Sequence, residues 1–409
     1  MILIRPTMRG KVMITAAFIS LAVAFINASL TICMAAAALS AIVLASFILS
    51  FLSLYRVELQ RGPMRDGTAG SSMMMPVIIR NLGRSRRQAL VIREETPYSS
   101  EKIVNTAIAP LFPGERRVIN RVVWAVRRGH YLLERITVAG GDPAGLFSRT
   151  KHFKLPCDIM VYPESVKLSW MPIRIKKQIQ ASNAGRPLGI SGIGNEFFGV
   201  REYRPCDGVR YIHWKSTAKH KKLMVREFEA NSITRVNIVL DVESSFIGGD
   251  EINSNFEYLV KTAASITNYL AGNFCQIIFV TGYNNEVMRV SGEAFSVKDR
   301  IMTALATLVP LKINFLEVLD ADLDYFRSNS ILYCLSMSEP DKVANRFDQL
   351  LDRGVDVRWI YAPGKCFSAF PFEASVKPRQ EEKKYSETFG IVPYVARKET
   401  NISRMLMYG

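Results

Sequence analysis

The chain has 409 residues and a formal net charge of +16, from 53 Lys or Arg and 37 Asp or Glu. Its cysteines are dispersed without a C-x-x-C pair, which excludes a disulfide framework and a cysteine-based zinc site and favours reduced thiols. The six are Cys33, Cys157, Cys206, Cys275, Cys334 and Cys366.

The first predicted element is a transmembrane helical hairpin over residues 1–58. Residues 12–54 contain no charged side chain, and this stretch is too long for one membrane-spanning helix of about 20 residues but suits two. The polar step 27–29 marks the expected reversal. A cleaved signal peptide is the alternative, but cleavage after residues 35–38 would leave the apolar residues 39–54 as a new N-terminus.

Basic residues flank both ends of this apolar stretch, whereas the connection between the two spans carries none. They are Arg5, Arg9 and Lys11 before it, and Arg56, Arg61 and Arg65 after it. Because Lys and Arg collect on the cytoplasmic side of membrane proteins, we expect a two-pass protein with both its N- and C-termini in the cytoplasm.

A small all-β, sandwich-like domain is predicted over residues 62–165. Short β-prone runs alternate there with turn sequences, at the spacing of an antiparallel sandwich. The predicted strands are residues 73–80, 88–94, 117–124 and 131–139.

From residue 231 to 375 the pattern changes, because β-branched runs alternate with amphipathic helical patterns. This alternation predicts a doubly wound α/β domain. The expected strands are residues 235–241, 276–281, 330–335 and 355–361, and the expected helices are residues 253–271, 296–308 and 340–352. The C-terminal tail, residues 376–409, is polar and has no predicted element.

Between the two domains, residues 170–230 carry the densest group of Gly, Arg, acidic and aromatic residues. Its notable members are Gly192, Gly194, Glu196, Phe197, Arg201, Tyr203, Asp207, Arg210, Trp214 and Lys215. This segment closely resembles the signature of the bacterial family named domain of unknown function fifty-eight, which runs approximately G-x-G-x-E-F, R-x-Y, then G-D-x-x-R-x-I-x-W-K. Cys206 replaces the usual glycine before Asp207.

The resemblance extends upstream. Residues 127–131 and 141–147 are similar to the family's R-R-G-x-Y and D-P-F-G-L-F pieces, with Ala144 in place of an aromatic residue. Together with the apolar hairpin, the similarity covers most of the chain.

Two interpretations of the signature remain open. In the first, internal ion pairs lock an irregular loop onto the domain, with Trp214 as its apolar anchor. In the second, the segment is a docking surface for an acidic partner protein, because Arg, Tyr and Trp are enriched at binding hot spots. Residues 186–226 contain nine Lys or Arg against three acidic residues, and this excess of positive charge would steer such a partner.

The resemblance also implies a C-terminal fold similar to the von Willebrand factor type A domain, which often holds a divalent cation through a D-x-S-x-S loop. Here Asp241 and Ser245 match that pattern, but Glu243 stands where serine is expected, and Thr281-Gly282 replaces a later Asp-Gly. The sequence therefore predicts a degraded cation site and no bound metal or cofactor. In the other interpretation, Asp241 and Ser245 cap the following loop or helix.

For function, the resemblance implies a MoxR-type AAA+ ATPase as partner and a transglutaminase-like membrane protein as a second one. We expect a non-catalytic scaffold of the bacterial inner (cytoplasmic) membrane that serves an envelope-linked assembly or chaperone process, in contact with the lipid bilayer.

The alternatives are a hydrolase that uses the carboxylates of Glu196 and Asp207, or a basic module that binds nucleic acid or anionic lipid. The sequence has no G-x-S-x-G, P-loop or H-E-x-x-H motif, so we expect no enzyme. It also has no nucleic-acid-binding motif, and a basic surface is expected beside anionic headgroups without any nucleic acid.

Overall fold

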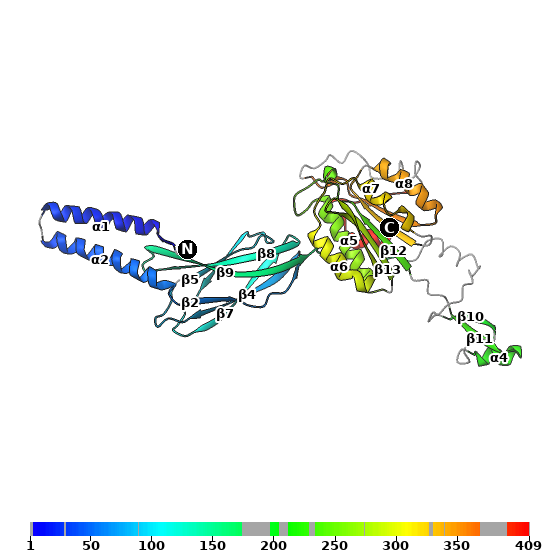
Figure 1. Ribbon diagram of the computed structural model, residues 1–409, viewed down its shortest axis with the longest axis horizontal. Helices are drawn as coiled ribbons and strands as arrows, with labels where there is room; N and C mark the ends of the chain where they lie inside the picture. Colours follow the sequence, from blue (N-terminus) through cyan, green and yellow to red (C-terminus); the bar gives the residue numbers. More distant parts are fainter. Residues whose placement is uncertain are drawn as a thin grey trace. The chain divides into compact units, whose positions relative to one another are not determined.

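The computed structural model describes residues 3–27, 30–88, 90–173, 197–203, 212–228, 234–273, 275–326, 330–338, 340–368 and 391–408. The chain divides into two compact units. The first comprises Met1–Glu164 with Thr303–Leu308, and the second comprises Ser165–Met302 with Val309–Gly409. Figure 1 labels the elements of both.

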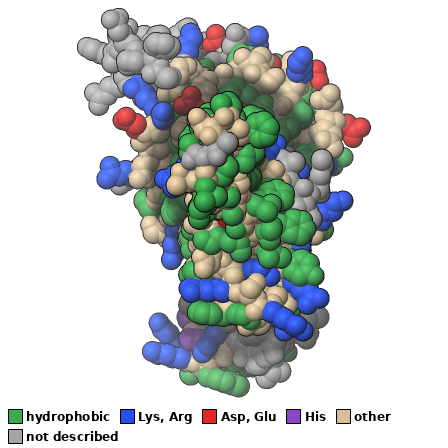
Figure 2. Space-filling model, turned by 90° about the vertical axis from the view of Figure 1, so that its left-hand side faces the viewer, with side chains coloured by type: hydrophobic (Ala, Val, Ile, Leu, Met, Phe, Trp, Pro, Cys, Tyr) green, Lys and Arg blue, Asp and Glu red, His purple; other side chains and the backbone are tan. Residues whose placement is uncertain are grey.

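The first unit begins with the hairpin of α1 (Met8–Asn27) and α2 (Leu30–Ser53), which turns where the polar step predicts it. Both helices are long and apolar enough to cross a membrane, with mean hydropathies of 1.7 and 2.5. The buried residues of the hairpin are all small: Gly10, Ala17 and Ala24 on α1, and Ala36, Ser46, Ser50 and Ser53 on α2. The large apolar side chains point outward, and the end of the hairpin that faces the viewer in Figure 2 is covered by hydrophobic atoms.

The strands of the first unit form two antiparallel sheets. One has the order β1-β9-β8-β5-β6, with β3 added to β9 in parallel, and the other has the order β2-β4-β7. The strands are β1 (Leu3–Pro6), β2 (Val57–Arg61), β3 (Gly67–Thr68), β4 (Ser71–Asn81), β5 (Leu90–Glu95), β6 (Ile103–Ile108), β7 (Arg116–Ala125), β8 (Gly129–Gly141) and β9 (Phe147–Tyr162).

The four strands predicted for this domain are all present, as β4, β5, β7 and β8. The sequence did not predict β1, β2, β6 or β9. The longest of these, β9, alternates Lys, Arg and His with apolar residues and contains Pro156, so its sequence is more typical of a loop than of a strand. Strand β1 precedes the hairpin in the sequence but pairs with β9 in the β domain, with Leu3 opposite Thr150.

A buried ion triad divides the apolar core between the two sheets. The carboxylate of Glu94 on β5 accepts from Arg61 on β2 at 2.5 Å and from Arg121 on β7. The three side chains are almost completely buried. One apolar cluster, which includes Leu54 and Ile79, lies on the side of the hairpin, and a second, which includes Met75, lies beyond the triad.

The second unit is built on a six-stranded sheet with the order β14-β13-β12-β15-β16-β17. All neighbours are parallel except β14, which pairs antiparallel with β13. The strands are β12 (Thr234–Leu240), β13 (Cys275–Tyr283), β14 (Glu286–Glu293), β15 (Ser330–Ser336), β16 (Asp356–Tyr361) and β17 (Tyr394–Val395). The predicted doubly wound α/β class and its four strands are confirmed.

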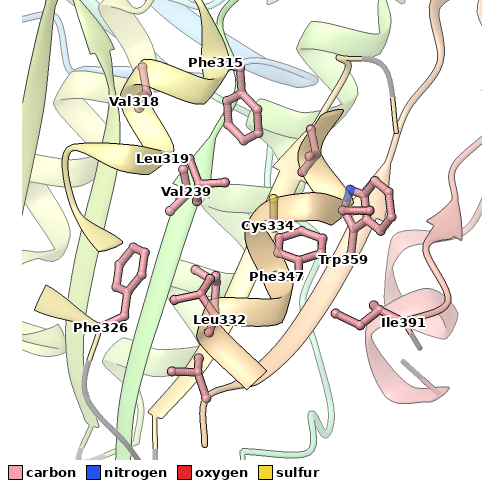
Figure 3. Packing of buried hydrophobic residues seen from close by; sticks show 14 of the residues in the cluster. Val239, Phe315, Val318, Leu319, Phe326, Leu332, Cys334, Phe347, Trp359 and Ile391 are labelled. Carbon is pink, nitrogen blue, oxygen red and sulfur yellow. The ribbon is translucent and has the colours of Figure 1, made fainter. Parts of the chain in front are cut away.

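Helices α7 (Phe315–Asp320) and α8 (Pro340–Asp352) pack on one face of this sheet. Figure 3 shows their core, which includes Phe315 of α7, Phe347 of α8 and Cys334 of β15. Helix α5 (Asn255–Ala271) also packs on β12, β13 and β15, and its N-cap is Ser254. Helix α6 (Ala294–Thr307) follows β14 directly. The three predicted helices are thus present as α5, α6 and α8.

The C-terminal tail was predicted to have no element, and this prediction was wrong. Strand β17 pairs with β16, and α10 (Ile402–Tyr408) follows it. The hydroxyl group of Tyr258 on α5 lies 3.6 Å from the sulfur of Met405 on α10. A short apolar helix at the end of a polar segment gives a weak periodic signal, and its burial on α5 is what stabilises it.

Candidate functional site

The described part of the signature is a small strand-helix-strand unit. It consists of β10 (Phe197–Glu202), α4 (Trp214–His220) and β11 (Met224–Phe228), and the two strands form an antiparallel sheet of their own. Five of the predicted signature residues lie outside the described residues: Gly192, Gly194, Glu196, Asp207 and Arg210. The other five, Phe197, Arg201, Tyr203, Trp214 and Lys215, lie on or beside this unit.

Main-chain hydrogen bonds hold the unit together. The amide of Tyr203 donates to the carbonyl of Leu223 at 2.8 Å, and the amide of His213 donates to the carbonyl of Met224 at 2.8 Å. Ile212 bridges to Val225, and both side chains are buried. The described part of the signature is therefore regular structure, whereas Glu196, Asp207 and Arg210, on which the ion-pair interpretation depends, lie outside the described residues.

Helix α4 begins at an unusual cap. His213 is the N-cap residue, and its Nδ1 accepts from the amide of Ser216 at 3.3 Å and lies 2.8 Å from the Ser216 hydroxyl group. The next two side chains point outward, since Trp214 is 67% exposed and Lys215 is also exposed. The expected role of Trp214 as an apolar anchor was wrong, because Ile212 and Val225 supply the buried contact instead.

The surface of this unit is strongly basic. Residues 197–203 and 212–228 contain six Lys or Arg against two Glu. The Nζ of Lys222 donates to Glu202 Oε1 at 2.8 Å, and this hydrogen bond lowers the pKa of the Glu202 carboxyl. Arg201 donates to the carbonyl of Glu202 at 3.0 Å. One of the two acids is thus already engaged by a cation of the unit itself.

The predicted cation site follows β12. The strand order reverses at β12, because β13 lies on one side of it and β15 on the other. Ligands of doubly wound sheets commonly bind at this position. Asp241 is completely buried there. Its Oδ1 accepts from the amide of Glu243 at 2.8 Å, and its Oδ2 accepts from the amide of Met337 at 2.8 Å and from the amide and hydroxyl group of Ser338 at 3.0 and 2.6 Å.

Burial raises the pKa of the Asp241 carboxyl to about 6, although its four hydrogen bonds act in the opposite direction. The carboxylate of Glu243 is also engaged, because one oxygen accepts from the Ser245 hydroxyl group at 2.8 Å and the other from the amide of Phe315 at 3.1 Å. Thr281 donates to the carbonyl of Leu240 at 3.1 Å.

These residues do not fit a divalent cation. A cation needs several oxygens directed at one point, whereas each oxygen of Asp241 and Glu243 accepts from a protein donor. Among the described residues, no group of three or more His, Cys, Asp or Glu side chains could hold a metal. In line with the capping interpretation, Asp241 accepts from the amide of Glu243 in the following loop, whereas the Ser245 hydroxyl group donates to Glu243. Asp241 also joins the ends of β12 and β15.

Residues 199–306 match the model of a family described as "Protein of unknown function DUF58". This segment is similar to the DUF58 family. The resemblance drawn from the signature is therefore confirmed for this segment, which contains β11, α4 and the first half of the α/β domain. The chain is also 25% identical over 217 residues to the uncharacterized protein YeaD of Bacillus subtilis (strain 168), and this match spans 50% of each protein.

Two solved structures are similar to parts of the chain. The SpRpn10 VWA domain is matched at 12% identity and a TM-score of 0.31, over 43% of this chain and 98% of that chain. A PapD-like domain of human CEP192 is matched at 10% identity and a TM-score of 0.19, over 27% of this chain and 87% of that chain.

The structure gives a role to the upstream DUF58-like piece, residues 141–147, that the sequence did not suggest. Asp142 accepts from the amides of Leu146 and Phe147 at 3.2 and 2.7 Å, which fixes the turn between β8 and β9. The carbonyl of Leu146 then accepts from the amide of Thr7, and the Thr7 hydroxyl group accepts from the amide of Gly10 at 3.1 Å. This turn therefore holds the first turn of α1.

The other end of the hairpin is held by two buried arginines. Arg87 donates to the carbonyls of Leu52 and Tyr55 at 2.5 and 2.8 Å, and Arg149 donates to the carbonyl of Phe51. These carbonyls lie at the C-terminal end of α2, where the carbonyl of Leu52 also accepts from the amide of Tyr55 at 3.1 Å, and a cation there interacts favourably with the helix dipole. Burial lowers the pKa of both guanidinium groups.

An exposed apolar strip lies on the outer face of the β2-β4-β7 sheet, and the sequence analysis missed it. Met74 on β4 is 59% exposed, and on β7 Val118, Val122 and Trp124 are 51%, 65% and 56% exposed. Met74 stands opposite Val122 in the register. Strict alternation in β7 could have revealed the strip, because every second residue from Val118 to Trp124 points away from the core.

Proposed function

We propose that this protein is a membrane-anchored, non-catalytic docking protein whose strand-helix-strand unit (residues 197–203 and 212–228) binds an acidic surface of a MoxR-type AAA+ ATPase. The observation that carries the proposal is the pair of exposed side chains Trp214 and Lys215 on a rigidly capped helix start. The partner class comes from the family resemblance, and the chemistry of the surface is consistent with it.

The anchor is the α1-α2 hairpin. Its two helices suit a bilayer in length and hydropathy, and both of its ends carry exposed basic residues, including Arg9, Lys11 and Arg56. The positive-inside rule therefore favours a cytoplasmic location for both units, the side on which an ATP-driven partner works. The inner membrane of a bacterium is the location that the family resemblance adds.

The docking surface has the composition of an interface hot spot. A tryptophan contributes a large apolar area at little entropic cost, and its exposure in the isolated chain leaves that area available. The surrounding cations include Lys215, Lys219 and Lys221, and they would steer an acidic partner. The cap at His213 fixes the start of the helix before a partner arrives, which lowers the entropy lost on binding.

The non-catalytic part of the proposal is supported by the Asp241 site. The switch point of a doubly wound sheet is the usual place for a ligand, but Asp241 is fully buried and accepts four hydrogen bonds there. A carboxylate in this state holds the sheet ends together. A transglutaminase-like membrane protein, the second partner class that the resemblance implies, would be recovered by the same experiment.

To test this, the tagged protein is purified from gently crosslinked membranes in the presence of ATP, and its companions are identified by mass spectrometry. The test variant is Trp214→Ala combined with Lys215→Gln. The matched control is Trp124→Ala, which removes a tryptophan of similar exposure from the apolar strip of the β domain.

We expect the wild type and the Trp124→Ala control to recover a MoxR-type ATPase, and the double variant to recover at most a tenth as much. Equal recovery with the double variant would refute docking at this unit. Loss with Trp124→Ala alone would move the docking surface to the apolar strip, and recovery of no ATPase with any chain would refute the partner class.

A further inference from the structure

Two loops of the β domain are held beside the end of α2. They are residues 82–88, between β4 and β5, and residues 109–115, between β6 and β7. Arg87 and Leu111 exchange two main-chain hydrogen bonds of 2.9 Å across them. The buried Asn81 amide group donates to the carbonyls of Ser85, Leu111 and Phe112 at 3.0, 3.3 and 3.2 Å. The two loops therefore form one ordered surface.

This surface is attached directly to the hairpin. The guanidinium of Arg87 donates to the last carbonyls of α2, and the amide of Leu82 donates to the carbonyl of Arg56 at 2.9 Å. Arg56 itself has a left-handed backbone with a φ of 54°, which turns the chain out of the helix and into β2. The first loop is therefore bonded to the segment that directly follows the second apolar helix.

The outward side chains of these loops combine positive charge with apolar tips. Arg56, Arg84 and Arg86 are exposed, Leu82 is 38% exposed, and Phe112 is 56% exposed. We refer to these five residues as the basic rim. The guanidinium of Arg86 lies 4.9 Å from the centre of the Phe112 ring, so charge and aromatic surface are adjacent.

The acidic side chains nearby leave this charge largely uncompensated. Glu115 is the carboxylate of the second loop, and it accepts from the amide of Phe112 at 2.8 Å and from Arg117 at 2.9 Å. These hydrogen bonds lower its pKa. Glu58 stands opposite Arg80 in the β2-β4 pairing. Each of these two acids therefore faces a cation outside the basic rim.

We propose that the basic rim binds the headgroups of anionic phospholipids and places Leu82 and Phe112 at the boundary between headgroups and acyl chains. The occupant is a bilayer because the rim continues from the end of a membrane-spanning helix. Arginine forms paired hydrogen bonds with phosphate, and aromatic and leucine side chains at such a boundary bury apolar surface. The rim fixes the orientation of the β domain on the membrane.

This inference rests on the proposed membrane anchor. The experiment places the full chain in nanodiscs of phosphatidylcholine alone, or of phosphatidylcholine with about one third phosphatidylglycerol, and measures amide hydrogen exchange of residues 82–88 and 109–115. The test variant is Arg84→Gln with Arg86→Gln. The matched control is Arg93→Gln with Lys102→Gln, which removes two exposed cations of β5 and its following loop.

We expect exchange in both loops to be about fivefold slower in the anionic nanodiscs for the wild type and the control. The slowing should be lost in the test variant and reduced by about 0.5 M salt, since salt screens headgroup attraction. Equal exchange in the two lipid mixtures, with the protein in the nanodiscs, would refute lipid binding by the basic rim but not the membrane anchor. A chain that stays soluble without lipid or detergent would refute the anchor itself, and slowing by an oligonucleotide but not by phosphatidylglycerol would refute the lipid assignment.

Discussion

The hydroxyl group of Thr7 donates to the carbonyl of Gly145 at 2.7 Å, across 138 positions of the sequence. This hydrogen bond joins the residue before the first apolar helix to the turn between β8 and β9. With the arginines at the end of α2, it means that both ends of the hairpin are fixed to one β domain.

We expect Thr7→Val to loosen the start of α1. The substitution removes the hydroxyl group that caps Gly10 and contacts Gly145, and loss of such a cap costs about 1 kcal/mol, or roughly fivefold in local opening. Hydrogen exchange of residues 142–150 in detergent measures this. Thr15→Val is the control, because the Thr15 hydroxyl group donates to the carbonyl of Val12 within the same helix. Equal exchange in the two variants would contradict the prediction.

Gly10→Ala should disrupt the same contact sterically. A Cβ at Gly10 would lie 2.0 Å from the carbonyl oxygen of Leu146, which belongs to the backbone and cannot rotate away. Overpacking of this kind costs about 1–3 kcal/mol. The matched control is Gly272→Ala, where the nearest atom would be 3.5 Å away. The thermal unfolding temperature of the detergent-solubilised protein should fall for Gly10→Ala and should stay within experimental error of the wild type for Gly272→Ala.

Glu94→Gln should destabilise the β domain severely. The substitution leaves Arg61 and Arg121 buried without their carboxylate, and breaking a buried ion pair from one side costs about 3–5 kcal/mol. Glu95→Gln is the neighbouring control, because Glu95 is exposed and its Arg135 partner lies 3.6 Å away at the surface. Urea-dependent hydrogen exchange in β5 and β7 gives the free energy of unfolding. A difference between the two variants below about 1 kcal/mol would show that the triad is dispensable.

Because of Asp241, we expect the free energy of unfolding of the α/β domain to fall as the pH rises from about 4 to 7. Its folded pKa of about 6 exceeds the ordinary value of 3.8, so the folded state binds the proton more tightly. The resulting stabilisation is complete below pH 3.8 and is lost as the pH rises through 6, a change of about 3 kcal/mol.

The check compares Asp241→Asn with the wild type in urea, using the fluorescence of Trp359, the one buried tryptophan among the four. The variant should be less stable at pH 4, because its amide donor faces amide donors of the protein. The difference in free energy of unfolding between the two proteins should become smaller towards pH 7. A difference that stays constant or grows over this range would show that the four hydrogen bonds, and not burial, determine the Asp241 pKa.

Much of the architecture was predictable because local patterns determine it. The apolar hairpin, the four predicted strands of the β domain, and the strands and long helices of the α/β domain all follow from hydrophobic periodicity. The elements that were missed depend on distant partners. Strand β1 has four residues and is a strand only because β9 lies beside it, and α7 has six residues and is stabilised by the core of Figure 3.

The candidate sites divide in the same way. Asp241 was predicted at the end of the first strand of the α/β domain, but its donors Met337 and Ser338 lie 96 and 97 positions away, and no local pattern indicates them. One interpretation of the signature made Trp214 its apolar anchor, yet the smaller Ile212 and Val225 form the buried contact. The basic rim also could not be predicted from the sequence, since its two loops are brought together by hydrogen bonds of Asn81 and Arg87 with the distant Leu111.

The pairing of β1 with β9 constrains the order in which the protein can be made. Leu3 leaves the ribosome long before its partner Thr150 is synthesised, and the hairpin lies between the two. In the proposed membrane-anchored protein, the first strand must therefore wait unpaired while the apolar helices insert and most of the β domain is synthesised. Pairing of β1 with β9 at this sheet edge would then fix the hairpin, so a chain inserted with its first residues on the opposite side of the membrane from the β domain could not complete the sheet.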